Sequence, residues 1–131
     1  MPILTVTVTD VDMGRGVPRT GVYLFSGGGP VEPPENADLS GTTDATGSVK
    51  FTASGFFNVG IIAKGYEAAD PNVAPPEAWK DTWTCWGACG VSRDLTYDFQ
   101  VKRTRLIGSI LARLLEAFPI LKSFPLIRRI P

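Results

Sequence analysis

Histidine is absent from this sequence, and cysteine and methionine occur only twice each. Without histidine, the chain lacks both the usual acid or base near neutral pH and the commonest metal ligand. Two cysteines with no histidine cannot complete the tetrahedral shell of a structural zinc site. We therefore expect a non-enzymatic protein with no metal and no cofactor.

Long apolar runs are also missing. In the C-terminal part, the longest uncharged apolar run covers residues 106–112. This is far shorter than the roughly 20 residues that a membrane-crossing helix needs. Met1 leads into a strand-like pattern without the basic and apolar regions of a secretory signal. We therefore expect synthesis and release in the cytosol.

Charge is balanced in total but unevenly distributed along the chain. Residues 1–102 carry 7 basic and 12 acidic groups, a net charge of −5. Residues 103–131 carry 6 basic groups and 1 acidic group, a net charge of +5. An acidic body with a basic tail favours attraction between copies, or onto another acidic partner. We expect no nucleic-acid partner.

Alternation of apolar and polar residues predicts strands on both sides of the middle of the chain. In residues 3–11, leucine and valine alternate with threonine, which is typical of a half-buried strand. Residues 22–25 and 95–101 predict two further strands. Residues 26–36, with three consecutive glycines and nearby prolines, predict an exposed loop.

Residues 41–66 are the stretch around which we expect the rest of the chain to be organised. A polar turn at residues 43–47 precedes an alternating strand at residues 48–52. Gly55 then interrupts the pattern before a second alternating strand at residues 57–62. This arrangement predicts a β-hairpin at the centre of a small antiparallel sheet.

Residues 67–90 form a long insertion that holds all three tryptophans and both cysteines. Loops of this length are usually functional or close over another part of the molecule. Residues 1–102 contain five predicted strands, or seven if residues 17–20 and part of the insertion are included. Short strands separated by turn signals predict a mainly β domain, an antiparallel immunoglobulin-like β-sandwich.

Several separated motifs resemble one known family. They are VTVTD at residues 6–10, GVP at 16–18, GVYL at 21–24, GTTDATG at 41–47, VKF at 49–51, FNV at 57–59 and AKGYE at 63–67. Together they resemble the carboxypeptidase regulatory-like domain, over residues 3–66 and in part over residues 95–101. The resemblance implies a transthyretin-like (prealbumin-like) sandwich of roughly seven strands. It also implies a stalk, accessory or surface domain without catalytic residues.

Cys85 and Cys89, in the segment CWGAC, are the most unusual local feature. We predict a local disulfide between them, worth only about 2 kcal/mol because the closed loop is small. Two buried free thiols are the alternative, since a redox dithiol normally has two intervening residues. A bridge would indicate an oxidising compartment.

Trp79, Trp83 and Trp86 lie close together in the insertion. Their faces, with the nearby Asp81, could stack a glycan. Alternatively, they pack the insertion onto the sheet or fill an interface with a neighbouring subunit. Four aspartates, Asp10, Asp12, Asp44 and Asp94, could suggest calcium, but their neighbours fit turn chemistry better and no EF-hand spacing occurs.

Residues 103–131 carry the clearest functional signal. Apolar side chains recur at steps of three and four up to Phe118 and predict an amphipathic helix, which Pro119 ends. A Phe-Pro near-repeat then favours an extended arm. The residues that we expect at an assembly interface are Leu106, Ile107, Ile110, Leu111, Leu114, Leu115, Phe118, Leu121, Phe124 and Ile127.

This C-terminal tail needs a cover. It could fold back over its own sandwich, pack against other copies or another structural protein, or lie on a membrane surface. The prolines favour a protein groove, because they leave backbone carbonyls that lipid cannot satisfy. The leading hypothesis is a structural subunit of a virion (a phage decoration, fibre or tail protein) or of another externally exposed assembly. The alternatives are an adhesion module that uses the tryptophans and a peripheral membrane protein that uses the tail.

Overall fold

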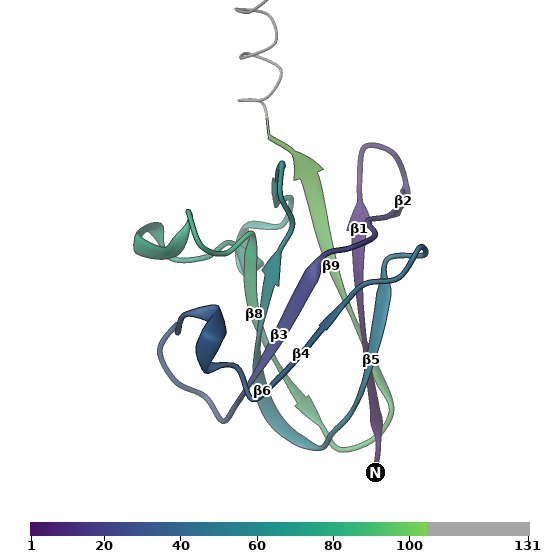
Figure 1. The fold of residues 1–131 in the computed structure, drawn as a ribbon, viewed down its shortest axis with the longest axis vertical. Coiled ribbons are helices and arrows are strands. Elements are labelled where there is room, and N and C mark those ends of the chain that lie inside the picture. The colour runs from purple at the N-terminus through teal and green to yellow at the C-terminus, as the bar shows by residue number, and fades with distance from the viewer. Residues whose placement is uncertain (105–131) are drawn as a thin grey trace, which may run out of the picture.

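A computed structural model describes residues 1–104, which form two sheets packed face to face (Figure 1). The five-stranded sheet contains β1 (Ile3–Asp10), β2 (Arg15–Gly16), β5 (Ser48–Thr52), β7 (Tyr66–Ala68) and β9 (Leu95–Arg103). The four-stranded sheet has the order β4 (Leu39–Thr42), β3 (Gly21–Ser26), β6 (Gly55–Ile62) and β8 (Cys85–Val91). Three single-turn 3₁₀ helices lie in the connections: η1 (Pro34–Asn36), η2 (Pro71–Val73) and η3 (Glu77–Trp79). The mainly β sandwich is confirmed.

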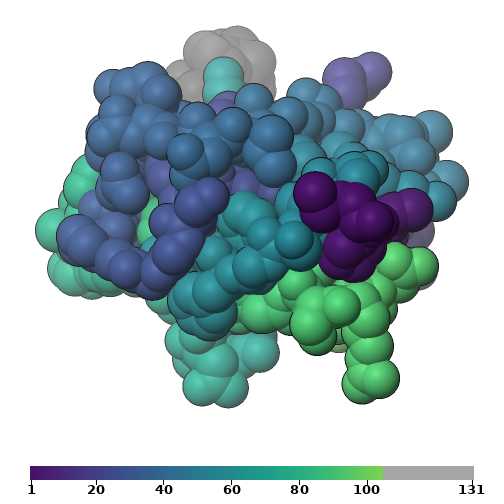
Figure 2. All heavy atoms as spheres, turned by 90° about the horizontal axis from the view of Figure 1, so that it is seen from below, coloured from purple at the N-terminus to yellow at the C-terminus, as the bar shows by residue number. Residues whose placement is uncertain are grey.

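The alternation in β1 produces the buried face that the sequence predicts. Leu4, Val6 and Val8 are fully buried, while the threonines between them face outward. β1 pairs with β5 on one side and with β9 on the other, so it occupies the middle of its sheet. Ile3 N–H also donates to the Asp94 carboxylate at 2.9 Å, which ties the start of β1 to the turn before β9. Figure 2 shows the purple start of the chain against the green last part of the described chain.

One strand pair departs from the predicted antiparallel arrangement. β1 and β9 run parallel, with Leu4 opposite Leu95 and Asp10 opposite Val101. Parallel neighbours need a long crossover between them. Here all the other described strands, β2 to β8, lie between β1 and β9 in the sequence. The chain therefore returns to the end of the sheet at which β1 begins before β9 starts.

The predicted central hairpin is wrong, because its two strands lie in different sheets. β5 pairs with β1, whereas β6 pairs with β3 and β8. The chain crosses between the sheets before Gly55, whose φ of 115° is a conformation that side-chain-bearing residues rarely adopt. The crossing lets Phe51 and Phe57 enter the core from opposite sheets, at 8% and 5% exposure. Burial of both rings is the physical reason for the arch.

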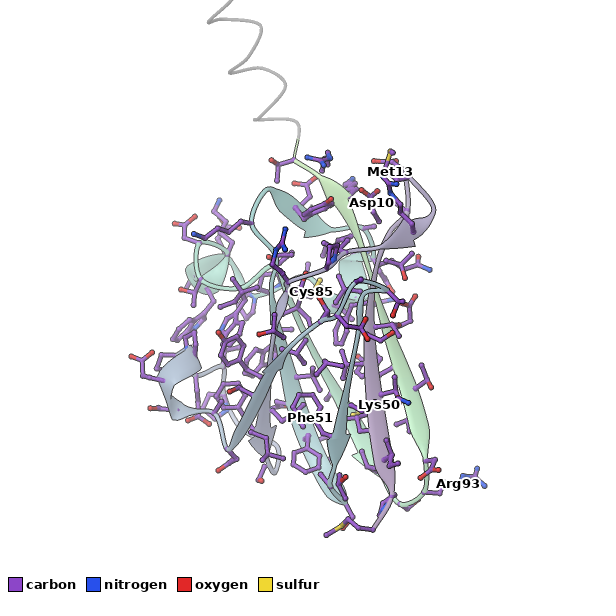
Figure 3. The ribbon with its side chains drawn as sticks, turned by 45° about the vertical axis from the view of Figure 1, so that its right-hand side comes forward. Asp10, Met13, Lys50, Phe51, Cys85 and Arg93 are labelled. Atoms are coloured by element: carbon purple, nitrogen blue, oxygen red, sulfur yellow. The ribbon has the colours of Figure 1, made fainter. Side chains whose placement is uncertain are left out.

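The core lies between the two sheets and is built from the alternating positions of both. Its members are Leu4, Val6, Val8, Val17, Val22, Leu24, Phe51, Ala53, Phe57, Val59, Ile61, Ala63, Cys85, Val91, Phe99 and Val101. Side chains from the β strands fill the space between the ribbons in Figure 3. All of these residues belong to the described part of the chain.

Other element predictions met mixed outcomes. Part of the insertion does form strands, β7 and β8, as the prediction of seven strands allowed. Residues 17–20 form a turn rather than a strand, and β4, which carries no alternating apolar pattern, was not predicted. The C-terminal helix and Phe-Pro arm lie outside the described residues. Within residues 1–104, no helix is long and apolar enough to span a membrane.

Candidate binding surface on the four-stranded sheet

The outward face of the four-stranded sheet carries an aromatic cluster. Tyr23 and Phe25 project from β3, and Trp83 and Trp86 come from the insertion and β8. The Trp83 ring lies edge-on to Tyr23 and Phe25, with centroid distances of 5.4 and 5.9 Å, and 5.2 Å from Trp86. Gly60 leaves the space for this ring, because a Cβ there would overlap it. The cluster therefore depends on a glycine in β6.

The glycine-rich loop at residues 26–36 folds over this cluster. Trp83 Nε1–H donates to the carbonyl of Glu32 at 3.0 Å, and Asn58 Nδ2–H donates to the carbonyl of Gly29 at 3.2 Å. Trp83 is consequently only 2% exposed. The loop thus closes a second, smaller apolar layer outside the sheet.

The three tryptophans do not form one exposed platform on which a glycan could stack. Trp83 is buried and has no free face for a sugar, whereas Trp79 in η3 and Trp86 in β8 are half-buried. Trp83 N–H donates to the Trp79 carbonyl at 2.9 Å, which fixes the turn that inserts the buried ring. For Trp83, the structure therefore supports packing of the insertion onto the sheet rather than stacking against a glycan.

The predicted Cys85–Cys89 disulfide is also wrong, because both cysteines are free thiols on one extended strand. A strand rises about 3.3 Å per residue, so four steps separate the two Cα atoms by roughly 13 Å. A disulfide requires less than about 7 Å. Burial raises the pKa of Cys85 to about 12 and also raises the pKa of Cys89. Both groups are therefore neutral thiols near pH 7, which disfavours nucleophilic chemistry.

The aspartates act in turns and links. Asp10 accepts from the N–H groups of Asp12 and Met13 at 2.9 and 3.1 Å. Asp44 accepts from the Thr46 hydroxyl and from the N–H groups of Thr46 and Ser48, and these bonds lower its pKa. Within residues 1–104, no three Cys, Asp or Glu side chains gather as a metal site.

A hollow of about 510 Å³ lies at the start of β3, beside the aromatic cluster. It is lined by Val17, Pro18, Arg19, Thr20, Gly21, Tyr23, Thr42, Ile62, Ala63, Lys64 and Tyr66. Tyr23 belongs to both features, since its ring contacts Trp83. The sequence analysis did not find this hollow, because its residues come from separate turns and strands that no motif connects.

Arg19 has a strained backbone at the edge of this hollow. Its φ of 55° makes it the one residue other than glycine with positive φ among residues 1–104. Such a conformation costs about 1–3 kcal/mol for a residue with a side chain. Buried Thr43 holds the turn: its carbonyl accepts from Arg19 N–H at 3.0 Å, and its hydroxyl donates to the Val17 carbonyl at 2.7 Å. The fold therefore enforces the strained conformation.

Comparisons with known proteins identify an architecture. No protein-family model matches the chain, and no curated protein sequence matches it. Among solved structures, the Bacillus anthracis TIE protein is similar over 79% of this chain, at 19% identity and a TM-score of 0.53. The likeness is one of fold.

Two further solved structures are similar at lower scores. They are BcpA, the major pilin subunit of Bacillus cereus (12% identity, TM-score 0.46), and Klebsiella pneumoniae 5-hydroxyisourate hydrolase (15% identity, TM-score 0.45). Each matches 79% of this chain, which spans 17% of the TIE protein, 30% of BcpA and 99% of the hydrolase. The resemblance to carboxypeptidase regulatory-like domains stays a prediction.

Proposed function

We propose that this chain is a non-enzymatic structural subunit, a β-sandwich joined to an assembly through residues 103–131. The observation that carries the proposal is that residues 1–104 supply a closed core of their own. Thirteen further large apolar residues follow between Leu106 and Ile130. Leaving all of them in water would forgo about 20 kcal/mol or more. This exceeds the stability of a typical domain, so they need a cover.

Packing against another protein chain is the cover that we favour. The tail carries a net charge of +5 and residues 1–102 a net charge of −5, which draws the tail of one copy towards the body of another. Prolines in the arm fit a protein groove better than lipid, where freed backbone carbonyls have no partner. Other copies of this chain or a second structural protein would both satisfy these conditions.

Within this proposal, we consider an externally exposed assembly first, such as a virion decoration, fibre or tail component. A compact sandwich with a separate apolar segment can present the sandwich outward while the segment anchors it.

Truncation after Thr104 tests the proposal, because it removes the apolar tail and leaves every strand of residues 1–104 intact. We expect the full chain to scatter light as an oligomer, or to co-purify with its partner, and the truncated chain to be a monomer. Full chains carrying Leu111→Asp with Leu115→Asp should behave like the truncation, whereas the matched control Arg113→Gln should still assemble. A full chain that is monomeric and co-purifies with no partner protein would contradict the proposal. Flotation of the full chain with liposomes would instead identify a membrane as the cover.

A further inference from the structure

The hollow beside the aromatic cluster combines features that the assembly role does not need. Arg19 lines it from a turn that buried Thr43 holds in a strained conformation, and Lys64 lines it from the turn after β6. Strain of this kind concentrates at functional sites, where a side chain must be held in one direction. Its volume of about 510 Å³ lies within the range of small-molecule sites.

The hollow is basic although the body around it is acidic. Its lining includes two cationic residues and no carboxylate. Within residues 1–104, the ion pairs are Lys80 with Glu77 and Lys102 with Glu67, so neither Arg19 nor Lys64 is paired there. A third cation is close, since the Arg103 guanidinium lies 5.3 Å from the centroid of the Tyr66 ring, and Tyr66 also lines the hollow. Unpaired cations around a concavity favour an anion.

The remaining lining points to the rest of the ligand. Tyr23 and Tyr66 are half-buried aromatic residues, and half-buried Ile62 adds an apolar side chain to the lining. The tyrosine hydroxyls and the exposed Thr42 supply hydrogen-bonding groups beside these rings. A ligand that fits has one oxyanion, a ring with an apolar face and several hydroxyl groups.

We propose that this hollow binds an acidic sugar, through a uronic-acid carboxylate or a sulfate ester. Arg19 and Lys64 hold the oxyanion, and Tyr23 and Ile62 contact the sugar ring. None of the described residues that line this site is a tryptophan or belongs to residues 103–131, so the proposal does not depend on the assembly role. It would give an outward-facing subunit a means of recognising charged glycans.

Calorimetric titration of the full chain tests the proposal with four probes. They are a galacturonic-acid trimer, a sulfated trisaccharide, neutral maltotriose and inorganic sulfate. We expect at least one of the acidic saccharides to bind 10-fold or more tightly than maltotriose and than inorganic sulfate, with affinity that falls as salt rises. Equal binding of maltotriose, equal binding of inorganic sulfate, or no binding of either acidic saccharide would each overturn the proposal.

Two variants locate the site. Arg19→Gly removes the guanidinium but fits the positive φ, so it should weaken binding at least 10-fold while the melting temperature stays equal or rises. Lys64→Gln should weaken binding at least 3-fold. The matched controls are Lys50→Gln on the other sheet and Arg93→Gln in the turn before β9, both labelled in Figure 3, and they should bind like the original chain. Retained affinity in Arg19→Gly, or an equal loss in the controls, would overturn the assignment.

Discussion

At the residue scale, several glycines decide where the aromatic rings lie. Gly60 makes room for Trp83 on the outer face, and Gly87 makes room on the inner side, where a Cβ would overlap the Tyr97 hydroxyl. Neither glycine has a positive φ, so backbone freedom does not explain them. The absence of a side chain is the property that matters, and such positions are invisible in an alternating pattern.

Gly60→Ala should destabilise the protein by about 1–3 kcal/mol, the usual cost of forcing an extra carbon into a packed layer. The Trp83 ring would have to move away from Tyr23 and Phe25. The midpoint of urea unfolding measures the change. The matched control is Gly29→Ala, where a Cβ meets no atom within 4 Å and which should unfold close to the original midpoint. Equal midpoints for the two variants would contradict the packing argument.

The two cysteines should react separately with iodoacetamide, without prior reduction. Cys89 is half-buried and should take up label in the folded protein at pH 8, whereas fully buried Cys85 should react only in denaturant. Mass spectrometry counts the labels, and Cys89→Ala should leave the folded protein unlabelled. A requirement for reductant before labelling would show that the bridge forms after all.

The raised pKa of Cys85 also gives this site a pH dependence. In the folded state its pKa is about 12 rather than 9.0, because burial disfavours the thiolate. The stability that this shift contributes is complete below pH 9 and is lost as the pH rises from 9 towards 12. Cys85→Ala should therefore show a flatter loss of stability than the original chain in that window, measured by urea unfolding at successive pH values.

At the scale of elements, sequence patterns located strands better than they located strand partners. Alternation found β1, β3, β5, β6 and β9, because a period of two follows directly from one buried face. The same period does not indicate which strand pairs with which. The link between β5 and β6, which crosses from one sheet to the other, was therefore predicted as a hairpin within one sheet. The sequence analysis did not predict β4, because its pairing with β3, rather than its own composition, makes it a strand.

The candidate site was harder still to predict. The tryptophans were visible as a group, but the burial of Trp83 depends on a loop some fifty residues earlier, through its bond to Glu32. The hollow is lined by residues of turns and strands between residues 17 and 66. The strained backbone of Arg19 at its edge is seen in the structure but not in the sequence. Contacts that join distant turns leave no spacing in the sequence.

The arch itself can be tested at Gly55. Alanine there should cost about 1–3 kcal/mol, because φ is 115° and only backbone strain opposes the change: no atom lies within 4 Å of a Cβ. Ser54→Ala, next to it in the exposed link, should change stability by no more than about 0.5 kcal/mol. Urea unfolding gives both values. If Gly55→Ala unfolds like Ser54→Ala, a strained crossing between the sheets does not describe this segment.

At the scale of the whole molecule, charge and apolar surface are divided between the sandwich and the tail. The net charges of −5 on residues 1–102 and +5 on residues 103–131 act at long range, whereas the apolar tail residues act only on contact. In the assembly that we propose, the opposite charges should therefore set the association rate, and the apolar tail residues should set the equilibrium.

Assembly should slow markedly as salt rises, while the final mass changes little. Raising NaCl from about 0.05 M to about 0.5 M shortens the screening length to a few ångströms. We expect the association rate to fall by about 10-fold or more, because steering between opposite charges is lost. The apolar contacts, which salt does not weaken, should preserve the oligomer that forms. Stopped-flow light scattering after dilution from mild denaturant measures both quantities. An oligomer that dissociates in high salt would show that charge, rather than the apolar residues of the tail, holds the copies together.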